Sequence, residues 1–112
     1  MALDGTLWVE DGIPYMVYCH EWVQIKDGTI DLVRLKDDLS DVAGPPLTLF
    51  NASDAPWTPP GRDRYVTDGP FLYRTGTGRL LMIWSSFTDS GYTTGIAASA
   101  SGRVRGPWTH QP

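Results

Sequence analysis

Two aspartates have the type and placement that could do chemistry. Asp4 and Asp68 each precede a glycine, and they stand at the same place in two similar stretches of the chain. A pair of carboxyl groups at unequal depths suits acid–base chemistry on a glycosidic bond, because one group must hold a proton at neutral pH while its neighbour stays charged. Asp-Gly is also a common turn dipeptide, so a turn role is the alternative for both residues.

Polar residues after a predicted apolar strand form a second group of candidates. His20 and Glu21 directly follow the apolar residues 14–19, where a loop would face the same site. Glu21 could replace Asp68 as the proton donor or accept a hydrogen bond from a sugar hydroxyl, and the alternative is a solvated loop carboxylate. We interpret His20 as a substrate contact, because the sequence has no second histidine at metal-ligand spacing. No metal is therefore assigned.

Tryptophans are candidates for binding sugar rings, whose C–H faces stack on aromatic planes. Trp22 lies in the loop after the apolar strand, and Trp57 lies in a Pro-rich loop, so both are predicted to contact substrate. Trp8 and Trp84 lie within predicted strands, where packing between sheets is the better interpretation. Ser85 could line the same pocket, but no base partner accompanies it, and we predict no nucleophile there.

The composition predicts the strands that must position these residues. Gly (12) and Pro (9) are frequent, whereas Glu and Lys occur only twice each, so the chain has little from which to build helices. Turn signals such as Asp11-Gly12 and Gly76-Thr77-Gly78 divide it into short apolar runs. We predict strands at 6–10, 14–20, 29–36, 47–50, 69–74, 79–87 and 92–99. The predicted fold class is all-β.

An internal repeat organises these strands. Asp4-Gly5 corresponds to Asp68-Gly69, Tyr15-Met16-Val17-Tyr18 to Leu81-Met82-Ile83-Trp84, and Val42-x-Gly44-Pro45 to Val104-x-Gly106-Pro107, at offsets of 64, 66 and 62 residues. Each unit reads as an antiparallel meander, and four-stranded meanders repeated radially are the blades of a β-propeller. We predict a first blade at 1–50, a Pro-rich loop at 51–65 and a second, incomplete blade at 66–112. Because propellers close with roughly four to eight blades, we expect a piece of a larger protein.

Charge and hydropathy argue against several partners. The formal net charge is −4 and the nine basic residues are scattered, which argues against nucleic acid and anionic membrane surfaces. The longest apolar run, residues 80–84, is far below the roughly 18 residues of a membrane span. The first residues lack the basic region of a signal peptide, so we expect a cytoplasmic protein if Met1 is the native start and otherwise leave the compartment open. Cys19, the single cysteine, is predicted to lie in the core.

The chain resembles glycoside hydrolase family 43, whose members are five-bladed β-propeller enzymes. The resemblance is carried by residues 3–18, 66–72, 98–102 and 106–108, which include Asp4-Gly5, Asp68-Gly69-Pro70 and Gly106-Pro107-Trp108. These motifs appear in the family's order through essentially the whole chain, and they cover about two blades of the family's domain. The resemblance implies action on plant polysaccharides or oligosaccharides that contain arabinose or xylose.

The resemblance also implies inverting hydrolysis with three carboxylates, of which two have counterparts here. Asp4 matches the aspartate that tunes the acid by like-charge repulsion. Asp68 matches the general acid, although the family usually has glutamate there, so the reach is one methylene shorter. The general base has no counterpart in the sequence, so we expect low or no activity of this chain alone. Calcium occurs in many full family domains through a histidine of another blade, and no cofactor is assigned to this chain.

Two alternatives to a glycosidase portion stay open at this point. The chain could be a non-catalytic carbohydrate-binding or oligomerising module, or a truncated gene product. One blade and part of a second would expose apolar faces and unpaired strand edges. We therefore expect a homo-oligomer, and a two-fold dimer is the commonest form.

Overall fold

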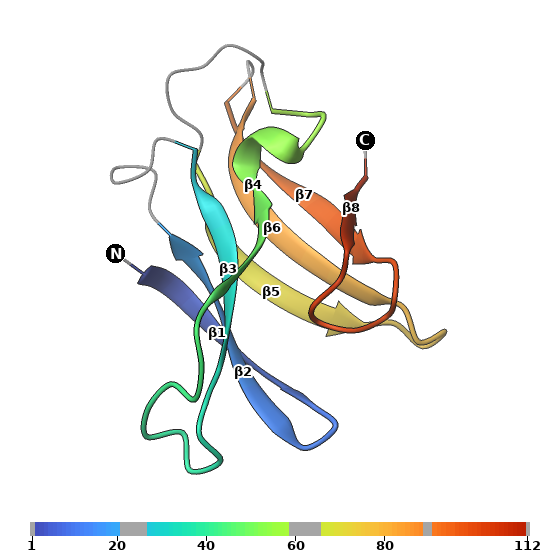
Figure 1. Cartoon of the computed structure of the whole chain (residues 1–112). Helices are drawn as coiled ribbons and strands as arrows, with labels where there is room; N and C mark the ends of the chain where they lie inside the picture. The colour runs from blue at the N-terminus through green and yellow to red at the C-terminus, as the bar shows by residue number, and fades with distance from the viewer. Residues whose placement is uncertain (1, 21–26, 59–65, 89–90, 112) are drawn as a thin grey trace.

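The computed structural model describes residues 2–20, 27–58, 66–88 and 91–111 (Figure 1). The first half holds strands β1 (Ala2–Glu10), β2 (Ile13–His20), β3 (Thr29–Arg34) and β4 (Leu47–Asn51), followed by the 3-10 helix η1 (Ala52–Asp54). The second half holds β5 (Asp68–Arg74), β6 (Leu80–Thr88), β7 (Gly91–Ser99) and β8 (Trp108–His110). No helix in these ranges is long and apolar enough to cross a membrane.

The strands form two four-stranded antiparallel sheets, which confirms the predicted all-β class. The first sheet has the order β1-β2-β3-β4 and the second the order β5-β6-β7-β8, so each is a simple meander. β1 and β5, the first strands of the two sheets, contact each other. The seven strands predicted from the sequence are all present, and the second sheet has a short fourth strand, β8, that the sequence did not predict.

The four Asp-Gly dipeptides do not share one conformation. Asp11 and Gly12 form the β1–β2 hairpin turn with φ angles of 52° and 77°, as a tight two-residue turn requires. Asp4-Gly5 and Asp68-Gly69 lie instead within strands, beside bulges between Leu3 and Thr6 and between Asp68 and Phe71. Gly69 has a φ of 54° at its bulge, which a glycine accommodates without strain. The turn interpretation is therefore wrong for these two dipeptides.

Strand register refines the internal repeat. Leu7 pairs with Met16 in the first sheet, and Phe71 pairs with Ile83 in the second. Since Leu7 and Phe71 are equivalent at the offset set by Asp4 and Asp68, Met16 corresponds to Ile83 and not to Met82. The sequence alignment of the second strands was one residue out of register, because a continuous apolar run gives no alternation by which to align it.

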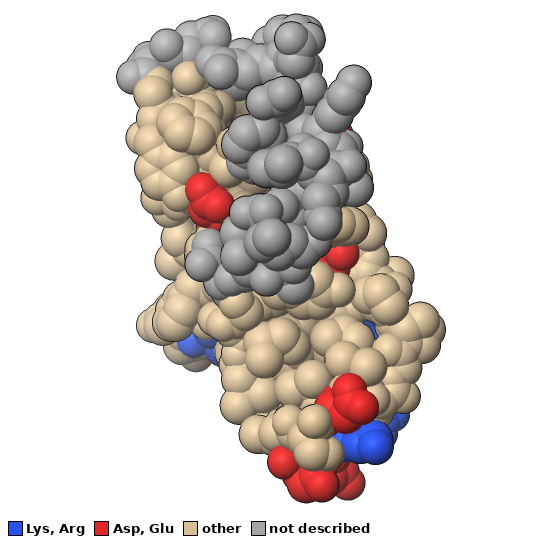
Figure 2. All heavy atoms as spheres, turned by 90° about the vertical axis from the view of Figure 1, so that its left-hand side faces the viewer, with Lys and Arg blue, Asp and Glu red and all other residues tan. Residues whose placement is uncertain are grey.

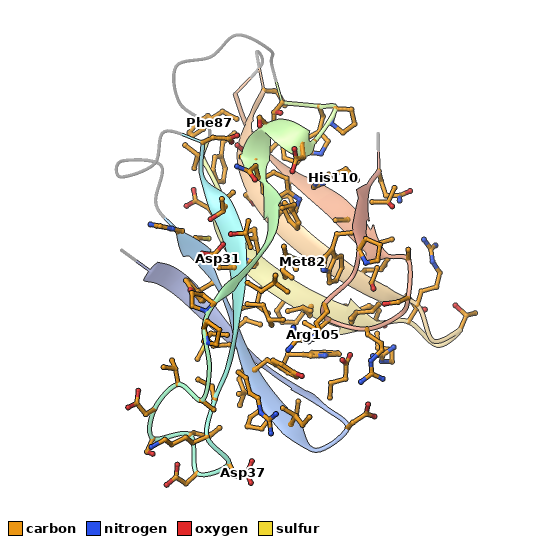
Figure 3. All side chains as sticks on the ribbon, in the orientation of Figure 1. Asp31, Asp37, Met82, Phe87, Arg105 and His110 are labelled. Carbon is orange, nitrogen blue, oxygen red and sulfur yellow. The ribbon has the colours of Figure 1, made fainter. Side chains whose placement is uncertain are left out.

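The core lies between the two sheets, where Met82 is visible in Figure 3. Val17, Cys19 and Ile30 of the first sheet are fully buried, as are Met82 and Trp84 of the second. Phe50 of β4 packs against Trp84 with ring centroids 5.2 Å apart. The predictions for Cys19 and Trp84 as packing residues are confirmed, and Trp8 packs against the edge of the same cluster.

A buried carboxylate joins the sheets at the end where the β1–β2 hairpin turns. Glu10 is 8% exposed, and its Oε1 accepts a hydrogen bond of 3.0 Å from the Val104 amide of the second sheet. Arg74 and Arg103 each bring a guanidinium nitrogen to 3.6 Å from the Glu10 carboxylate. Figure 2 shows acidic and basic side chains together at the lower end of the molecule.

His110 packs against aromatic side chains of both sheets. It lies on β8, half-buried, and its ring contacts Phe50 edge-on at a centroid distance of 4.6 Å. Burial lowers the pKa of His110 below its ordinary value, and the carboxylate of Asp54 opposes part of that shift. His110 is thus part of the packing between the sheets.

Candidate active site

Asp68 begins β5, and the strand register places it directly opposite Ser85 of β6. The bulge that follows Asp68 interrupts the alternation of β5, so the carboxylate stays partly exposed although Pro70 and Leu72 on the same strand are buried. Tyr92 of β7 donates a hydrogen bond of 3.1 Å from its hydroxyl to Oδ2 of Asp68. The carboxylate is therefore held in place by a neighbouring strand.

Two further hydroxyls extend this cluster across the second sheet. Ser85 and Thr94 are register partners on β6 and β7, and their hydroxyl oxygens are 3.0 Å apart. Tyr92 is two residues from Thr94 and therefore shares its face, and its ring meets that of Phe87 edge-on at a centroid distance of 5.0 Å. The sequence predicted Asp68 and Ser85 for the site, and the structure brings these two together.

Asp4 occupies the corresponding place in the first sheet. Its backbone lies in β1 beside the bulge between Leu3 and Thr6, as Asp68 lies beside the bulge of β5. The Asp4 side chain is outside the described part of the structure, so its carboxylate is placed only by its strand. Because β1 contacts β5, the two aspartates belong to adjoining first strands.

His20 ends β2 and is paired with Ala2 at the start of β1. Its Nδ1 lies 3.7 Å from Oδ2 of Asp31 on β3, and the Asp31 carboxylate is 8% exposed while the imidazole is 37% exposed. Burial raises the pKa of Tyr18, and the nearby charge of Asp31 adds to the increase. The structure thus places a buried acid behind His20, at the same end of the first sheet as Asp4.

Glu21 and Trp22 lie outside the described residues, so their predicted roles as proton donor and substrate contacts stay predictions. Within the described ranges, no group of three or more His, Cys, Asp and Glu residues could hold a metal ion. The site is accordingly built from carboxylates, hydroxyls and one imidazole. Such groups can exchange protons with a substrate oxygen and can hydrogen-bond sugar hydroxyls.

Trp57 is held apart from this cluster by the segment that follows η1. The Asp27 carboxylate accepts a hydrogen bond of 3.1 Å from the Ser53 amide, and Thr58 donates one of 2.8 Å to the Ala55 carbonyl. This local network seats the indole of Trp57 on Trp84, with ring centroids 4.9 Å apart.

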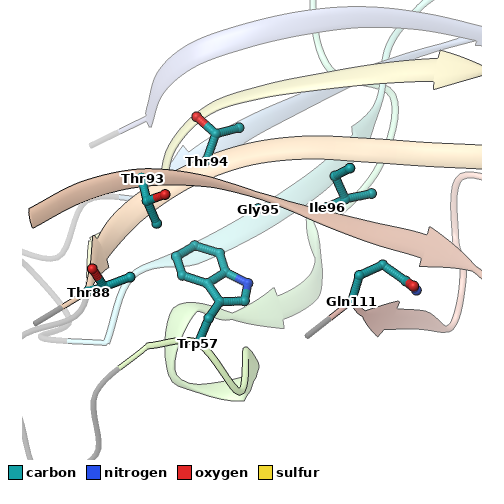
Figure 4. A pocket seen from close by; sticks show the side chains of 7 residues that line it. All are labelled: Trp57, Thr88, Thr93, Thr94, Gly95, Ile96 and Gln111. Atoms are coloured by element: carbon teal, nitrogen blue, oxygen red, sulfur yellow. The ribbon is translucent and has the colours of Figure 1, made fainter. Parts of the chain in front are cut away.

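The Trp57 indole lies on the face of β7 opposite the Thr94 side chain, as Figure 4 shows. With Thr88, Thr93 and Gln111 it lines a pocket of about 300 Å³. Trp57 therefore does not join the Asp68 cluster, and its predicted contact with substrate stays a prediction.

Sequence reasoning missed Asp31, Tyr92 and Thr94. Asp31 carried a signal, because an acidic residue within an apolar strand segment is rarely left buried without a partner. Tyr92 and Thr94 are two residues apart in a predicted strand that follows a Ser-Gly turn signal. This spacing places both side chains on one face of the strand, but it does not predict which strand they contact. Their proximity to Asp68 depends on the register of three strands.

Comparison with solved structures gives several similar folds. The crystal structure of an endo-arabinase from Bacteroides thetaiotaomicron VPI-5482 has 46% sequence identity and a TM-score of 0.90, and the match covers 100% of this chain and 42% of that one. A thermostable family-43 glycoside hydrolase has 22% identity and a TM-score of 0.82, and the match covers 98% of this chain and 36% of that one. The GH43_1 enzyme from Xanthomonas citri, complexed with xylose, has 19% identity and a TM-score of 0.71, and the match covers 99% of this chain and 32% of that one.

The chain spans less than half the length of each of these structures. The likeness confirms the expectation of a partial β-propeller. No protein-family model matches the sequence, and the search of curated proteins gave no match.

Proposed function

Because this chain resembles about two blades of a family 43 glycoside hydrolase, we propose that it is a portion of an inverting enzyme for arabinose- or xylose-containing polysaccharides. The observation that carries the proposal is its likeness along the whole chain to an endo-arabinase. The hydrogen-bonded Asp68 at the start of β5 adds chemical support. The two sheets then correspond to blades at 1–50 and 66–112, joined by the Pro-rich residues 51–65.

In this proposal Asp68 is the general acid and Asp4 the aspartate that tunes it. A nearby negative charge opposes ionisation of an acid, so an adjoining carboxylate helps the acid keep its proton. Tyr92 is a positioning residue, since its hydroxyl holds Oδ2 of Asp68 from the neighbouring part of the sheet. Glu21 is the alternative proton donor, and the choice between the two acids is part of the proposal.

The proposed substrate contacts lie at the same end of the sheets as the two aspartates. His20 and Ser85 carry polar atoms next to the starts of β1 and β5, where a sugar would meet the two aspartates. Trp22 and Trp57 are proposed to stack on sugar rings farther along the chain of the polysaccharide. The family resemblance gives no counterpart of the general base in this sequence, so we expect little hydrolysis by this chain alone.

The test replaces the water that the absent general base would activate with azide, a nucleophile that needs no base. Azide can attack the anomeric carbon in place of base-activated water, while the acid protonates the departing glycosidic oxygen, so the products are a glycosyl azide and an alcohol. We expect the 112-residue chain to form arabinosyl azide from a methyl arabinofuranoside, whose alkoxide leaving group needs the proton, at a rate well above that of free azide. Asp68→Asn should lower that rate by roughly 10²-fold or more, as expected for loss of a general acid.

The matched control is Asp37→Asn, an exposed aspartate in the β3–β4 connection, which should leave the rate unchanged. Equal rates for the Asp68→Asn and unsubstituted chains would refute Asp68 as the acid. Glu21→Gln is assayed beside it, because a loss confined to that variant would assign the proton donor to Glu21 instead.

We also propose that the isolated chain associates with itself through the second sheet. The face of that sheet turned away from the first sheet is here called the outer face. Its exposed apolar side chains are Phe71, Tyr73, Phe87, Tyr92 and Ile96, which are 40–56% exposed. Exposed apolar side chains on one face of a sheet favour association, and a second copy offers an equivalent face for a two-fold dimer.

A further inference from the structure

A second pocket lies between the two sheets, at the end of the strands opposite Asp4 and Asp68. It has a volume of about 270 Å³, and its walls come from the end of β3, the start of β4 and the turn after β7. Two arginines, Arg34 and Arg105, line it together with Tyr15, Pro46 and Leu47. Arg105 is labelled in Figure 3, between the second sheet and the lower part of the first. None of these residues belongs to the Asp68 cluster.

Among the described residues the two arginines have no acidic partner, unlike Arg74 and Arg103 at the same end of the molecule. Arg74 donates hydrogen bonds to the carbonyls of Gly78 and Gly102 and lies beside Glu10. Arg103 pairs with Asp11 and Glu10. In the described part of the chain, neither Arg34 nor Arg105 has an ion pair or a side-chain hydrogen bond. Both guanidinium groups therefore keep their donors available.

Two carboxylates that are near Arg34 in the sequence form hydrogen bonds with other residues of their own loop. Asp38 accepts hydrogen bonds from the amide and hydroxyl of Ser40, and Asp41 accepts one from the Val42 amide. Two acidic residues of the connection between β3 and β4 thus accept hydrogen bonds within that connection instead of pairing with Arg34. Two positive charges in one pocket, without an acidic partner among the described residues, attract an anion locally, although the net charge of the protein is −4.

The rest of the lining suits a small ring. Tyr15 is 6% exposed and lines the pocket, and within the described ranges its hydroxyl has no hydrogen-bond partner. Pro46 and Leu47 add apolar surface beside the guanidinium groups. A volume of about 270 Å³ is near the lower limit of ligand pockets, which start at roughly 300 Å³, and it therefore suits a single ring rather than an oligosaccharide.

We propose that Arg34, Arg105 and Tyr15 form a binding site for a small carboxylate carried on a six-membered ring. A planar guanidinium binds a carboxylate through two parallel hydrogen bonds, and the tyrosine hydroxyl donates a third. The ring then lies against Pro46 and Leu47. A uronic acid and an aromatic acid share this chemistry, and the experiment separates them.

The test is a titration of the isotopically labelled 112-residue chain, followed by amide NMR at low ionic strength. Sodium glucuronate and sodium benzoate are the probes, and glucose is the neutral analogue of the first. We expect saturable shifts of amides at the end of β3 and in the turn after β7 with at least one acid, and none with glucose. Arg34→Gln and Arg105→Gln should each weaken binding by about tenfold or more, the value of one charge-assisted pair.

Arg79→Gln is the matched control, because Arg79 is an exposed arginine in the β5–β6 hairpin and lines neither pocket. It should leave the affinity unchanged. Tyr15→Phe removes the hydroxyl alone and should weaken binding less than either arginine change. The proposal fails if glucose binds as well as glucuronate, if Arg79→Gln weakens binding as much as Arg34→Gln, or if neither acid gives saturable shifts. The tighter of the two acids identifies the source of the carboxylate.

Discussion

At the scale of single residues, Gly95 is needed because Trp57 occupies the space above it. A Cβ atom at position 95 would lie 2.2 Å from Cζ2 of Trp57, and the indole is backed by Trp84, so it cannot easily move. We expect Gly95→Ala to lower the free energy of unfolding by about 1–3 kcal/mol, as overpacking does. Urea denaturation measures the change.

Two controls separate this contact from the loss of a glycine. Gly76→Ala places a Cβ in open space and should change stability little. The double variant Gly95→Ala/Trp57→Leu should be less destabilised than the sum of its two single variants, because the clash is gone. Strictly additive effects would contradict the contact.

His110 makes stability depend on pH. Burial lowers the pKa of His110 below 6.5, so in the range between the folded value and 6.5 the unfolded chain binds more protons than the folded one. The free energy of unfolding therefore falls as the pH drops below about 6.5, and above that pH this contribution is complete. We expect the urea midpoint to decline less between pH 7.5 and 5.5 in His110→Gln than in the unsubstituted chain.

His20→Gln serves as the control for this experiment, since it removes the other histidine and leaves β8 intact. It should keep the decline of the unsubstituted chain. A decline that is equally steep in His110→Gln would mean that other groups account for the acid sensitivity.

Among the site residues, those next to a sequence signal could be predicted and those placed by register could not. Asp68 and Ser85 could be named as candidates because Asp68 belongs to the repeated Asp-Gly motif and Ser85 follows the apolar residues 80–84. Tyr92 reaches Asp68 from a strand that is two strands away, and no local pattern reports such a distance. Asp31 carried a local signal as an acid within an apolar strand, but its contact with His20 of the neighbouring strand depends on register and could not be predicted.

At the scale of elements, Glu10 connects the β1–β2 hairpin to the turn after β7. Its carboxylate accepts the Val104 hydrogen bond and faces Arg74 and Arg103. Glu10→Ala would leave the Val104 amide unpaired and would remove the buried carboxylate from beside Arg74, while Arg103 would keep its pairing with Asp11. We expect a loss of about 2–4 kcal/mol in the free energy of unfolding, measured by urea denaturation, because removing one partner of a buried charged pair is costly.

The control for Glu10 is its exposed neighbour. Asp11 pairs with Arg103 but is 65% exposed, so Asp11→Asn should cost no more than about 1 kcal/mol, the usual limit for a surface pair. Glu10→Gln keeps an acceptor for Val104 and should fall between the two. A cost of Glu10→Ala no larger than that of Asp11→Asn would show that the sheets are held by packing alone.

The strands themselves were the most predictable elements. Gly and Pro turn signals fixed their ends to within a few residues, since a turn dipeptide acts locally. β8 was missed because it is only three residues long, Trp108–His110. It also follows Gly106-Pro107, a turn signal that more often marks the end of a strand. The strand bulges were missed because each depends on the partner strand as well as on its own glycine.

At the scale of the whole molecule, one side of the second sheet lacks the cover that the other side has. The side facing the first sheet buries Leu72, Met82 and Trp84, whereas the outer face exposes a row of aromatic and aliphatic side chains. The chain covers 42% of the similar endo-arabinase, and a propeller blade packs on both faces. Cover for the outer face therefore has to come from another chain or from another part of a longer one.

Self-association of the 112-residue chain follows from that open face. We expect light scattering after size-exclusion chromatography to give a mass at least twice that of a single chain of 12.4 kDa at micromolar concentration. Phe71→Ser and Ile96→Ser, at side chains 56% and 40% exposed, should each shift the equilibrium toward monomer, because each removes apolar area that association would bury. Val42→Ser changes a side chain that is 51% exposed but lies outside the outer face, and it should leave the mass distribution as it was. A monomer at all concentrations, or equal effects of the three substitutions, would mean that the outer face does not bind a second copy.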